Sequence, residues 1–229
     1  MKNNLTKSTE DYLKAIYALS LDGTSASTSA LAANLKVAPA SITGMLKRLA
    51  VTTPPLVNYR KHQGATLTSE GKRAALKIVR HHRLLETYLH QSLGFPWDEV
   101  HEEACRLEHV ISDALEERID TVLGHPTHDP HGDPIPTADL QMPQEKSLQL
   151  STVRPPHKVK IKRVNADDPN LLRYLKEKNL TPGSKLEVRA YSPFDGNLTL
   201  LVNGSESELI VGPTVTRHIF VDNKLKGKP

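Results

Sequence analysis

The first seventy residues show two kinds of hydrophobic spacing, one typical of helices and one typical of strands. Apolar residues recur at helical intervals after Ser8, which predicts a helix that starts there and ends by Gly23. A short helix is expected from Thr28, and another from Pro39, because a helix tolerates proline at its first position. The alternating segments LVNY and ATLT then predict a hairpin.

The middle of the chain carries two longer helical patterns. The first covers residues 69–90 and the second covers residues 97–123, after which the proline-rich stretch THDPHGDPIP interrupts the pattern. Residues 137–156 are polar and contain proline, so they predict a linker. The segments VKIKRV, KLEVRAY, LTLLV and IVGPTV follow as strand candidates, which indicates a small β-rich domain.

Composition narrows the class of protein. The chain has 229 residues, of which 38% are hydrophobic, and it can form two or three domains. A single cysteine excludes an internal disulfide, and the first ten residues lack the apolar core of a signal peptide, so a cytoplasmic location is expected. No apolar run is long enough to span a bilayer. The formal net charge of +4 permits an anionic partner such as nucleic acid.

The densest group of candidate ligands is HEEACRLEH, residues 101–109. On one continuous helix, His101, Cys105, Glu108 and His109 fall within an arc of about 100°. A metal ion needs lone pairs that converge from a rigid frame, and this spacing supplies them. The rise from His101 to Glu108 is roughly 10 Å, which is too far for one ion, so two metal sites are expected.

Two polar residues interrupt the apolar stripe of the preceding helix. His82 and Glu86 stand four residues apart at positions that the pattern reserves for apolar side chains. Because buried polar groups need partners, these residues and His101 predict a three-ligand metal site. The alternative is a solvated His–Glu pair that contributes a few tenths of a kcal/mol, about 0.2–0.5.

Simpler roles are expected for the other candidate ligands. The proline-rich loop contains His125, His128, Asp129 and His131, but a loop backbone is poorly preorganised, so surface or structural roles are expected for all four. Asp11, taken alone, is an acid that stabilises the start of a helix.

Five stretches together form a specific combination: TEDYLKAIYAL, ALAANLKVAPASITGMLKRL, LTSEGKRAALKIVRHHRLLETYL, VHEEACRLEHVIS and HGDPIP. They resemble the diphtheria-toxin-repressor family of metal-dependent transcriptional regulators over nearly the whole chain. The resemblance implies a mainly α fold with a small β domain. It comprises a winged helix-turn-helix DNA-binding domain (residues 1–72), a metal-binding and dimerisation domain (73–140), a linker (141–156) and an SH3-like β-barrel (157–229).

The resemblance also implies the metal ligands. The family's primary activating site corresponds to Asp11, Cys105, Glu108 and His109. Its ancillary site corresponds to His82, Glu86 and His101, with Asp168 from the barrel as a further carboxylate and Asp167 or solvent as the alternative to it. Leu171 stands at the position of a second barrel ligand and cannot coordinate.

The expected metal follows from the donor atoms and from the resemblance. Position 11 is aspartate in manganese-type members and methionine in iron-type members, but manganese-type members carry an acid where this chain has Lys14, so Lys14 favours two separated sites. A hard carboxylate suits Mn²⁺ or Fe²⁺, whereas the Cys105 thiolate also accepts softer ions. Mn²⁺ is the first expectation and Fe²⁺ the second, and Zn²⁺, Co²⁺ or Cd²⁺ are expected to substitute in vitro.

The expected partner is double-stranded operator DNA, which a homodimer binds at a pseudo-palindromic site. Short side chains on the helix from Pro39 face the bases, Gly44 permits close approach, and cations contact phosphates. The residues expected at the DNA are Pro39, Ala40, Ser41, Thr43, Gly44, Lys47, Arg60 and Lys61. The function implied is a metal-activated repressor of metal-homeostasis genes, with no membrane and no small-molecule substrate.

Two other classes of protein use the same residue types. A metal-dependent hydrolase would hold a water nucleophile with the same His, Glu and Cys ligands, but the sequence has no recognisable pattern for oxyanion donors. A metal-storage module would bind DNA equally well with and without a chelator. We expect a regulator and not an enzyme.

Overall fold

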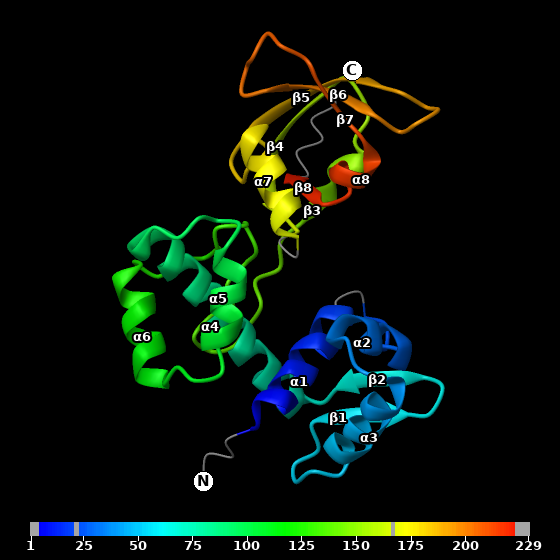
Figure 1. The fold of residues 1–229 in the computed structure, drawn as a ribbon, viewed down its shortest axis with the longest axis vertical. Coiled ribbons are helices and arrows are strands. Elements are labelled where there is room, and N and C mark those ends of the chain that lie inside the picture. Colours follow the sequence, from blue (N-terminus) through cyan, green and yellow to red (C-terminus); the bar gives the residue numbers. More distant parts are fainter. Residues whose placement is uncertain (1–4, 21–22, 166–167, 223–229) are drawn as a thin grey trace. The chain divides into compact units, whose positions relative to one another are not determined.

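The computed structural model describes residues 5–20, 23–165 and 168–222 (Figure 1). The chain packs into two compact units. The first contains Met1–His82, Leu107–Ser112 and Pro136–Met142, and the second contains Arg83–Arg106, Asp113–Ile135 and Pro143–Pro229. The predicted domain boundaries at residues 72 and 140 therefore differ from the packing. The packing places a boundary after His82, and the segments Leu107–Ser112 and Pro136–Met142 belong to the first unit.

The first unit contains the predicted helix-turn-helix and hairpin. Its elements are α1 (Lys7–Leu19), α2 (Thr28–Leu35), α3 (Pro39–Ala50), β1 (Val57–Arg60) and β2 (Gly64–Leu67). Leu13 of α1, Leu31 of α2 and Ile42 of α3 are fully buried in one core, and burial of each such side chain contributes about 1.5–3 kcal/mol. Because cores are close-packed, α1 and α3 hold a fixed relation to each other.

Helix α1 begins slightly earlier than the pattern predicts. Thr6 is the N-cap, and its hydroxyl oxygen accepts a hydrogen bond from the backbone N–H of Thr9 at 3.3 Å. The predicted start at Ser8 was wrong because Thr6 and Ser8 are both good capping residues, and only the backbone geometry distinguishes them. The helix ends at Leu19, before Gly23 with its φ of +82°.

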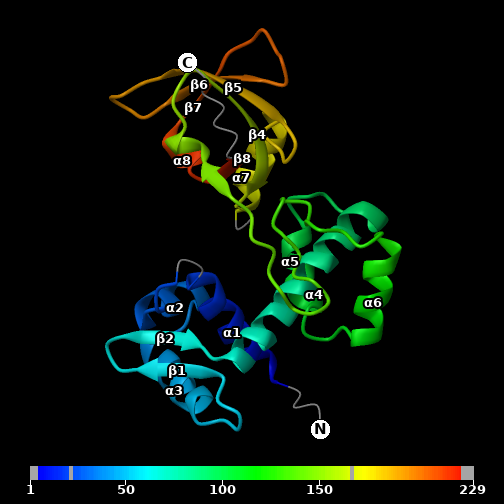
Figure 2. The ribbon, with the colours of Figure 1, turned by 180° about the vertical axis from the view of Figure 1, so that it is seen from behind.

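The hairpin is antiparallel and lies beside α3 in both views (Figures 1 and 2). Its register pairs Val57 with Leu67 and Arg60 with Gly64. Gly64 has a φ of +87°, and a Cβ there would lie 2.5 Å from the carbonyl oxygen of Ala26. Glycine is therefore required where the hairpin turns and packs against the segment before α2.

The two long helical patterns end differently in the structure. Helix α4 (Ser69–Leu93) extends as predicted, with a slightly later end. The predicted helix over 97–123 is instead α5 (Val100–Leu107), a turn, and α6 (Asp113–Val122). The backbone N–H of Val110 bonds to the carbonyl of Leu107 in that turn. β-Branched Val110 and Ile111 lose side-chain freedom in a helix, which favours a break there.

The second unit contains an antiparallel sheet of order β3-β8-β4-β5-β6-β7. The elements are β3 (Ser147–Gln149), η1 (Leu150–Thr152), β4 (His157–Val164), α7 (Pro169–Glu177), β5 (Lys185–Tyr191), β6 (Leu198–Val202), β7 (Leu209–Val211), α8 (Pro213–Thr216) and β8 (Ile219–Asp222). Apolar side chains from the strands and from α7 form its core. No described helix is long and apolar enough to cross a membrane.

The predicted linker over 141–156 belongs partly to this sheet. β3 pairs with β8 in the register Leu148 to Val221, and Leu150 and Val153 are buried in the core of the sheet domain. The segment looks like a linker in sequence because its few apolar residues form no long periodic run. The β domain therefore begins near residue 147 and not at 157.

Candidate metal centre

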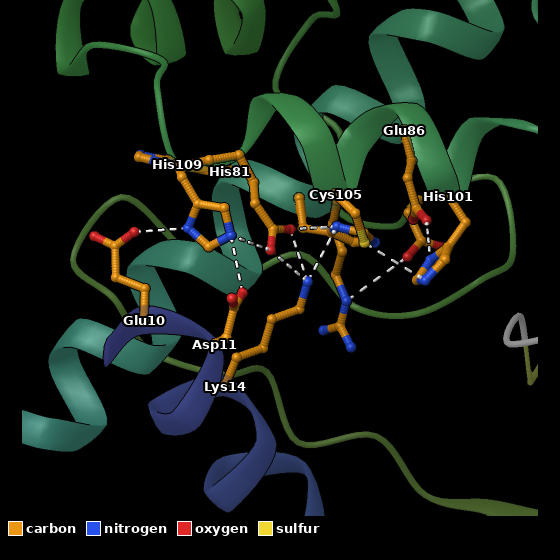
Figure 3. Close-up of polar contacts among 12 residues, drawn as sticks. Glu10, Asp11, Lys14, His81, Glu86, His101, Cys105 and His109 are labelled. Atoms are coloured by element: carbon orange, nitrogen blue, oxygen red, sulfur yellow. Dashed lines mark hydrogen bonds and ion pairs between the residues drawn. The ribbon is translucent and has the colours of Figure 1, made fainter. Parts of the chain in front are cut away.

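The first unit brings Asp11, Glu108 and His109 together from segments almost one hundred residues apart. Asp11 projects from α1 toward His109 (Figure 3). Glu108 and His109 lie in the turn after α5. Nε2 of His109 lies 3.0 Å from Oδ1 of Asp11 and 3.3 Å from Oε1 of Glu108. One ligand atom from each residue lies within 4.8 Å of the other two, which is the convergence that a metal ion needs.

Lys14 and His82 also contact this cluster. Nζ of Lys14 donates to Oε1 and Oε2 of Glu108 at 2.9 and 2.7 Å, and it lies 3.2 Å from Nδ1 of His82. Nδ1 of His82 is in turn 2.5 Å from Oε2 of Glu108. The sequence assigned His82 to the ancillary group with Glu86 and His101, whereas the structure pairs it with Glu108 of the primary group.

The environment of Glu108 favours its ionised form. Burial raises the pKa of this carboxyl, but the hydrogen bond and charge of His82, together with the charge and hydrogen bond of Lys14, outweigh burial and hold the pKa below its ordinary value. Glu108 is therefore ready to act as an anionic ligand. The same contacts mean that a cation must compete for it with the ammonium of Lys14.

Cys105, His101 and Glu86 are three of the predicted ligands in the second unit. Cys105 is on α5, and its Sγ lies 3.6 Å from Nε2 of His101. Nδ1 of His101 lies 3.1 Å from Oε1 of Glu86, and Figure 3 shows these two side chains facing each other. Glu86 and His101 therefore lie together.

The same unit contains a buried cluster of Glu86, Asp129 and His131. These side chains offer ligand atoms within 4.8 Å of one another, and the residues are 2%, 8% and 0% exposed. The sequence predicted surface or structural roles for Asp129 and His131, and the surface part of that prediction is wrong. His125 and His128 do lie at the surface, where their ring nitrogens are 2.9 and 2.7 Å from carboxylate oxygens of Asp120 and Glu145.

Local backbone geometry orders this loop. Oδ1 of Asp129 accepts hydrogen bonds from the backbone N–H groups of His131 and Asp133 at 2.9 and 3.0 Å. Gly132 has a φ of +88°, and a Cβ there would meet the carbonyl oxygen of Lys162 at 2.0 Å. A proline-rich loop is thus rigid here because its backbone groups are satisfied internally. The Asp-x-His-Gly spacing in DPHGDP is the sequence feature that could have indicated this ordered loop.

His131 is oriented through both of its ring nitrogens. Nε2 lies 2.8 Å from the carbonyl oxygen of Trp97, whose ring stacks on the imidazole, and Nδ1 lies 3.6 Å from Oε2 of Glu86. Since a carbonyl only accepts, Nε2 carries the proton and Nδ1 faces Glu86. This leaves Nδ1 directed into the carboxylate cluster.

The charges in this cluster are incompletely balanced. Burial, together with the neighbouring charges of Glu86 and Asp133, raises the pKa of Asp129 to about 7 against the lowering effects of Arg83 and His131. Burial lowers the pKa of His131, but hydrogen bonding and charge from Glu86 outweigh it and raise that pKa overall. Two buried carboxylates beside one another are stabilised by a cation or by a proton.

Asp168, the predicted barrel ligand, has a different role. It is exposed and serves as the N-cap of α7, where its Oδ1 accepts from the backbone N–H of Asn170 at 2.9 Å. Among the described residues it belongs to neither ligand group. Asp167, the alternative at this place, lies outside the described residues.

Both ligand groups fit a hard divalent cation by their chemistry. The first offers two carboxylates and an imidazole, and the second offers the same set in a more buried setting. Such oxygen-rich sets suit Mn²⁺ and Fe²⁺, and imidazole also suits Zn²⁺.

The face expected to bind DNA is assembled within the first unit. Pro39, Thr43 and Lys47 of α3 line a groove together with Lys61 and His62 of the hairpin tip. The remaining predicted contacts, namely Ala40, Ser41, Gly44 and Arg60, are exposed. Ser27 and Ser29 at the start of α2 line the same groove. The sequence analysis did not include these two residues, although the backbone N–H groups at a helix start favour anions such as phosphate.

Known protein families match each of the three regions of the chain. Residues 4–65 match the family "Iron dependent repressor, N-terminal DNA binding domain", and residues 68–137 match "Iron dependent repressor, metal binding and dimerisation domain". Residues 148–223 match the FeoA domain.

Individual relatives match over nearly their full length. The iron-dependent repressor IdeR of Mycobacterium leprae is 31% identical and covers 90% of this chain and 93% of its own. The diphtheria toxin repressor of Corynebacterium diphtheriae is 30% identical, with 90% and 94% covered. A solved manganese-dependent transcriptional repressor in complex with manganese has a TM-score of 0.85 and 38% identity, with 93% and 98% covered.

These matches confirm the predicted resemblance and the fold class, and they give the hydrolase alternative no support. The chain belongs to the diphtheria-toxin-repressor family of metal-dependent, DNA-binding transcriptional repressors.

Proposed function

We propose that this chain represses genes of metal homeostasis in response to Mn²⁺, with Fe²⁺ as the second candidate. The observation that carries the proposal is the convergence of Asp11 from α1 with Glu108 and His109 from the turn after α5. An aspartate at position 11 supplies a hard oxygen donor, which favours Mn²⁺ or Fe²⁺ over softer ions. Both metals occur in the names of the related proteins.

The first proposed site uses Asp11, Glu108 and His109, and Cys105 remains an expectation from the sequence. A bound divalent cation supplies the positive charge that lets two carboxylates and an imidazole remain close together. Asp11 is part of α1, and α1 shares its core with α3. Holding Asp11 against the 107–112 turn therefore also restrains the helix proposed to enter the major groove.

The second proposed site uses Glu86, Asp129 and His131, with His101 beside Glu86. Its support is the burial of two carboxylates and one imidazole within reach of a single ion. Burying such charges is unfavourable unless they are paired or coordinate a metal. This assignment replaces the predicted trio of His82, Glu86 and His101.

The proposed metal response works by ordering the DNA-binding elements before DNA docks. DNA docking restrains α3 and the hairpin, so restraint that is already present in the metal-loaded protein lowers the free energy that docking costs. A coupling of about 1–3 kcal/mol changes DNA affinity roughly 5- to 150-fold, and DNA tightens metal binding by the same factor. We propose that a cytoplasmic homodimer binds a pseudo-palindromic operator in this way.

The residues of the DNA face have different proposed roles. Ala40, Ser41 and Thr43 approach base edges, while Gly44 leaves space for the backbone of α3 to approach closely. Lys47, Arg60 and Lys61 bind phosphates, which makes the affinity fall with rising salt. The N-terminal Pro39 sets the start of the reading helix.

The test uses DNA that the protein itself selects. A pool of random duplexes is selected with Mn²⁺ present, and one selected duplex is then titrated by fluorescence anisotropy with Mn²⁺, Fe²⁺, Zn²⁺ or EDTA. We expect tight binding with Mn²⁺ or Fe²⁺ that EDTA reverses. Equal binding in EDTA would instead show a storage protein that binds DNA independently of metal.

A further inference from the structure

Glu10 contacts the first metal cluster from outside it. Its Oε2 lies 2.7 Å from Nδ1 of His109, while Nε2 of the same ring lies 3.0 Å from Oδ1 of Asp11. Figure 3 shows Glu10 and Asp11 on opposite sides of the imidazole. The two nitrogens of His109 therefore face two different carboxylates, both carried by α1.

We propose that Glu10 is a positioning residue for the first metal site. Its carboxylate accepts the Nδ1–H of His109 and so directs the lone pair of Nε2 toward a cation held with Asp11 and Glu108. This inference rests on the metal site of the proposed function. It adds a residue that is not itself a ligand but holds the proton on Nδ1 of His109 while Nε2 coordinates the cation.

An ionised carboxylate only accepts hydrogen bonds, and in the metal-free protein each ring nitrogen of His109 faces one, Glu10 at Nδ1 and Asp11 at Nε2. A cation held with Asp11 and Glu108 would replace the proton on Nε2, while Nδ1 keeps its proton and donates it to Glu10. Nε2 is then the nitrogen that coordinates, and it is the one that faces the other ligand atoms. A carboxylate behind a ligating histidine also raises its basicity, and loss of such a partner typically weakens metal binding about 10- to 100-fold.

A simpler role for Glu10 exists, because an acid in the first turn of a helix interacts favourably with the helix dipole. That role needs no specific partner. The side chain of Glu10 is instead only 17% exposed and is joined to a residue 99 positions away in the chain. Its placement is therefore explained by His109 and not by α1 alone.

The position of Glu10 also bears on the switch. Glu10 and Asp11 are adjacent in α1, and they contact the two nitrogens of one ring. His109 is thus held by α1 through a contact that exists before a cation arrives. Glu10 has then already oriented His109. Metal loading adds a second link between α1 and the turn that carries His109.

The experiment compares Glu10→Ala and Glu10→Gln with wild type in the full-length chain. Zn²⁺ is the probe, because it is redox-inert and diamagnetic, and its affinity is measured by calorimetry. Nitrogen-detected NMR of the histidine rings, in EDTA and with Zn²⁺, reports which nitrogen of His109 carries the proton. Glu102→Ala is the matched control, since it removes an exposed carboxylate whose ion-pair partner is Arg106.

We expect Glu10→Ala to weaken Zn²⁺ binding at this site about 10- to 100-fold and to remove the protected Nδ1–H signal of His109 in EDTA. Glu10→Gln should restore both in part, because its amide oxygen still accepts a hydrogen bond. Glu102→Ala should match wild type. Urea unfolding in EDTA verifies that each variant is folded.

Three results would overturn the inference. They are wild-type affinity in Glu10→Ala, an unchanged His109 signal despite weaker binding, and no rescue by Glu10→Gln. In each of these cases wild type still binds Zn²⁺ and the proposed function stands. A wild-type chain whose His109 never engages Zn²⁺ would instead overturn the proposed site together with this inference.

Discussion

The ammonium of Lys14 bonds to both carboxylate oxygens of Glu108, at 2.9 and 2.7 Å, across 94 residues of sequence. Glu108 is almost fully buried and Lys14 is one-quarter exposed. A fixed positive charge therefore lies beside a carboxylate that the proposed function assigns to a divalent cation. The charge stabilises the metal-free cluster and opposes metal binding.

Replacing Lys14 with methionine should tighten Mn²⁺ binding, because the variant has no ammonium to compete for Glu108. Loss of about 1 kcal/mol of competition corresponds to a roughly 5-fold gain in affinity. Calorimetry measures the gain, and Lys72→Met, which removes an exposed charge from α4, is the control. Equal affinity in wild type and Lys14→Met would show that Lys14 moves away without cost.

Asp11→Ala should abolish the stimulation of DNA binding by Mn²⁺ while leaving the protein folded. The substitution removes the α1 carboxylate that lies 3.0 Å from His109, so a metal ion no longer links α1 to the turn. Anisotropy with the selected duplex tests this, and circular dichroism verifies the fold. Full stimulation in the variant would refute the role of Asp11.

Asp129→Asn should remove one equivalent of bound Mn²⁺ per chain. The amide keeps an oxygen that can accept from the backbone N–H groups of His131 and Asp133, but it lacks the charge of a good ligand. Equilibrium dialysis measures the stoichiometry. Asp139→Asn is the control because Asp139 is exposed and lies outside the ligand groups described in the structure. Unchanged stoichiometry would remove the second site from the proposal.

The metal-free protein should lose stability as the pH rises from about 4 toward about 7. Asp129 has a pKa raised to about 7 in the fold, so the folded state holds a proton that the unfolded state releases near its ordinary value of 3.8. Stability from this protonation is present at low pH and is lost across that window. The raised pKa of His131 acts in the same direction, at and above its ordinary value of 6.5.

Glu108 acts in the opposite direction, because its lowered pKa gives stability that is present above its ordinary value of 4.5 and lost on acidification. Urea unfolding in EDTA at several pH values therefore compares wild type with Asp129→Asn. The variant should show a flatter decline between about pH 5 and pH 7. An identical slope in both proteins would show that Asp129 does not titrate in this range.

Much of the architecture could be predicted because local periodicity reports it directly. The helices from Thr28, Pro39 and Ser69 begin where the sequence predicts, and the hairpin has its expected strands. Each signal depends on residues within a few positions of one another, such as Pro39 at the first position of α3. The family motifs added Asp11 as a candidate ligand, which spacing alone assigned to a helix start.

The ligand partners depended on contacts that periodicity does not encode. A single-helix pattern placed Glu108 and His109 on α5, whereas the helix ends at Leu107 and the turn presents both to α1. His82 was grouped with Glu86 by its four-residue spacing, and that spacing gave no sign of its contact with Glu108.

The sequence by itself determined the helical and strand segments, the family and the candidate ligand types. Only the tertiary structure decided how those ligands divide into clusters and that Asp129 and His131 are buried. The physical reason is that element type follows from local backbone and side-chain preferences. Ligand convergence instead depends on where a turn ends a helix and which distant side chains then fill the space beside it.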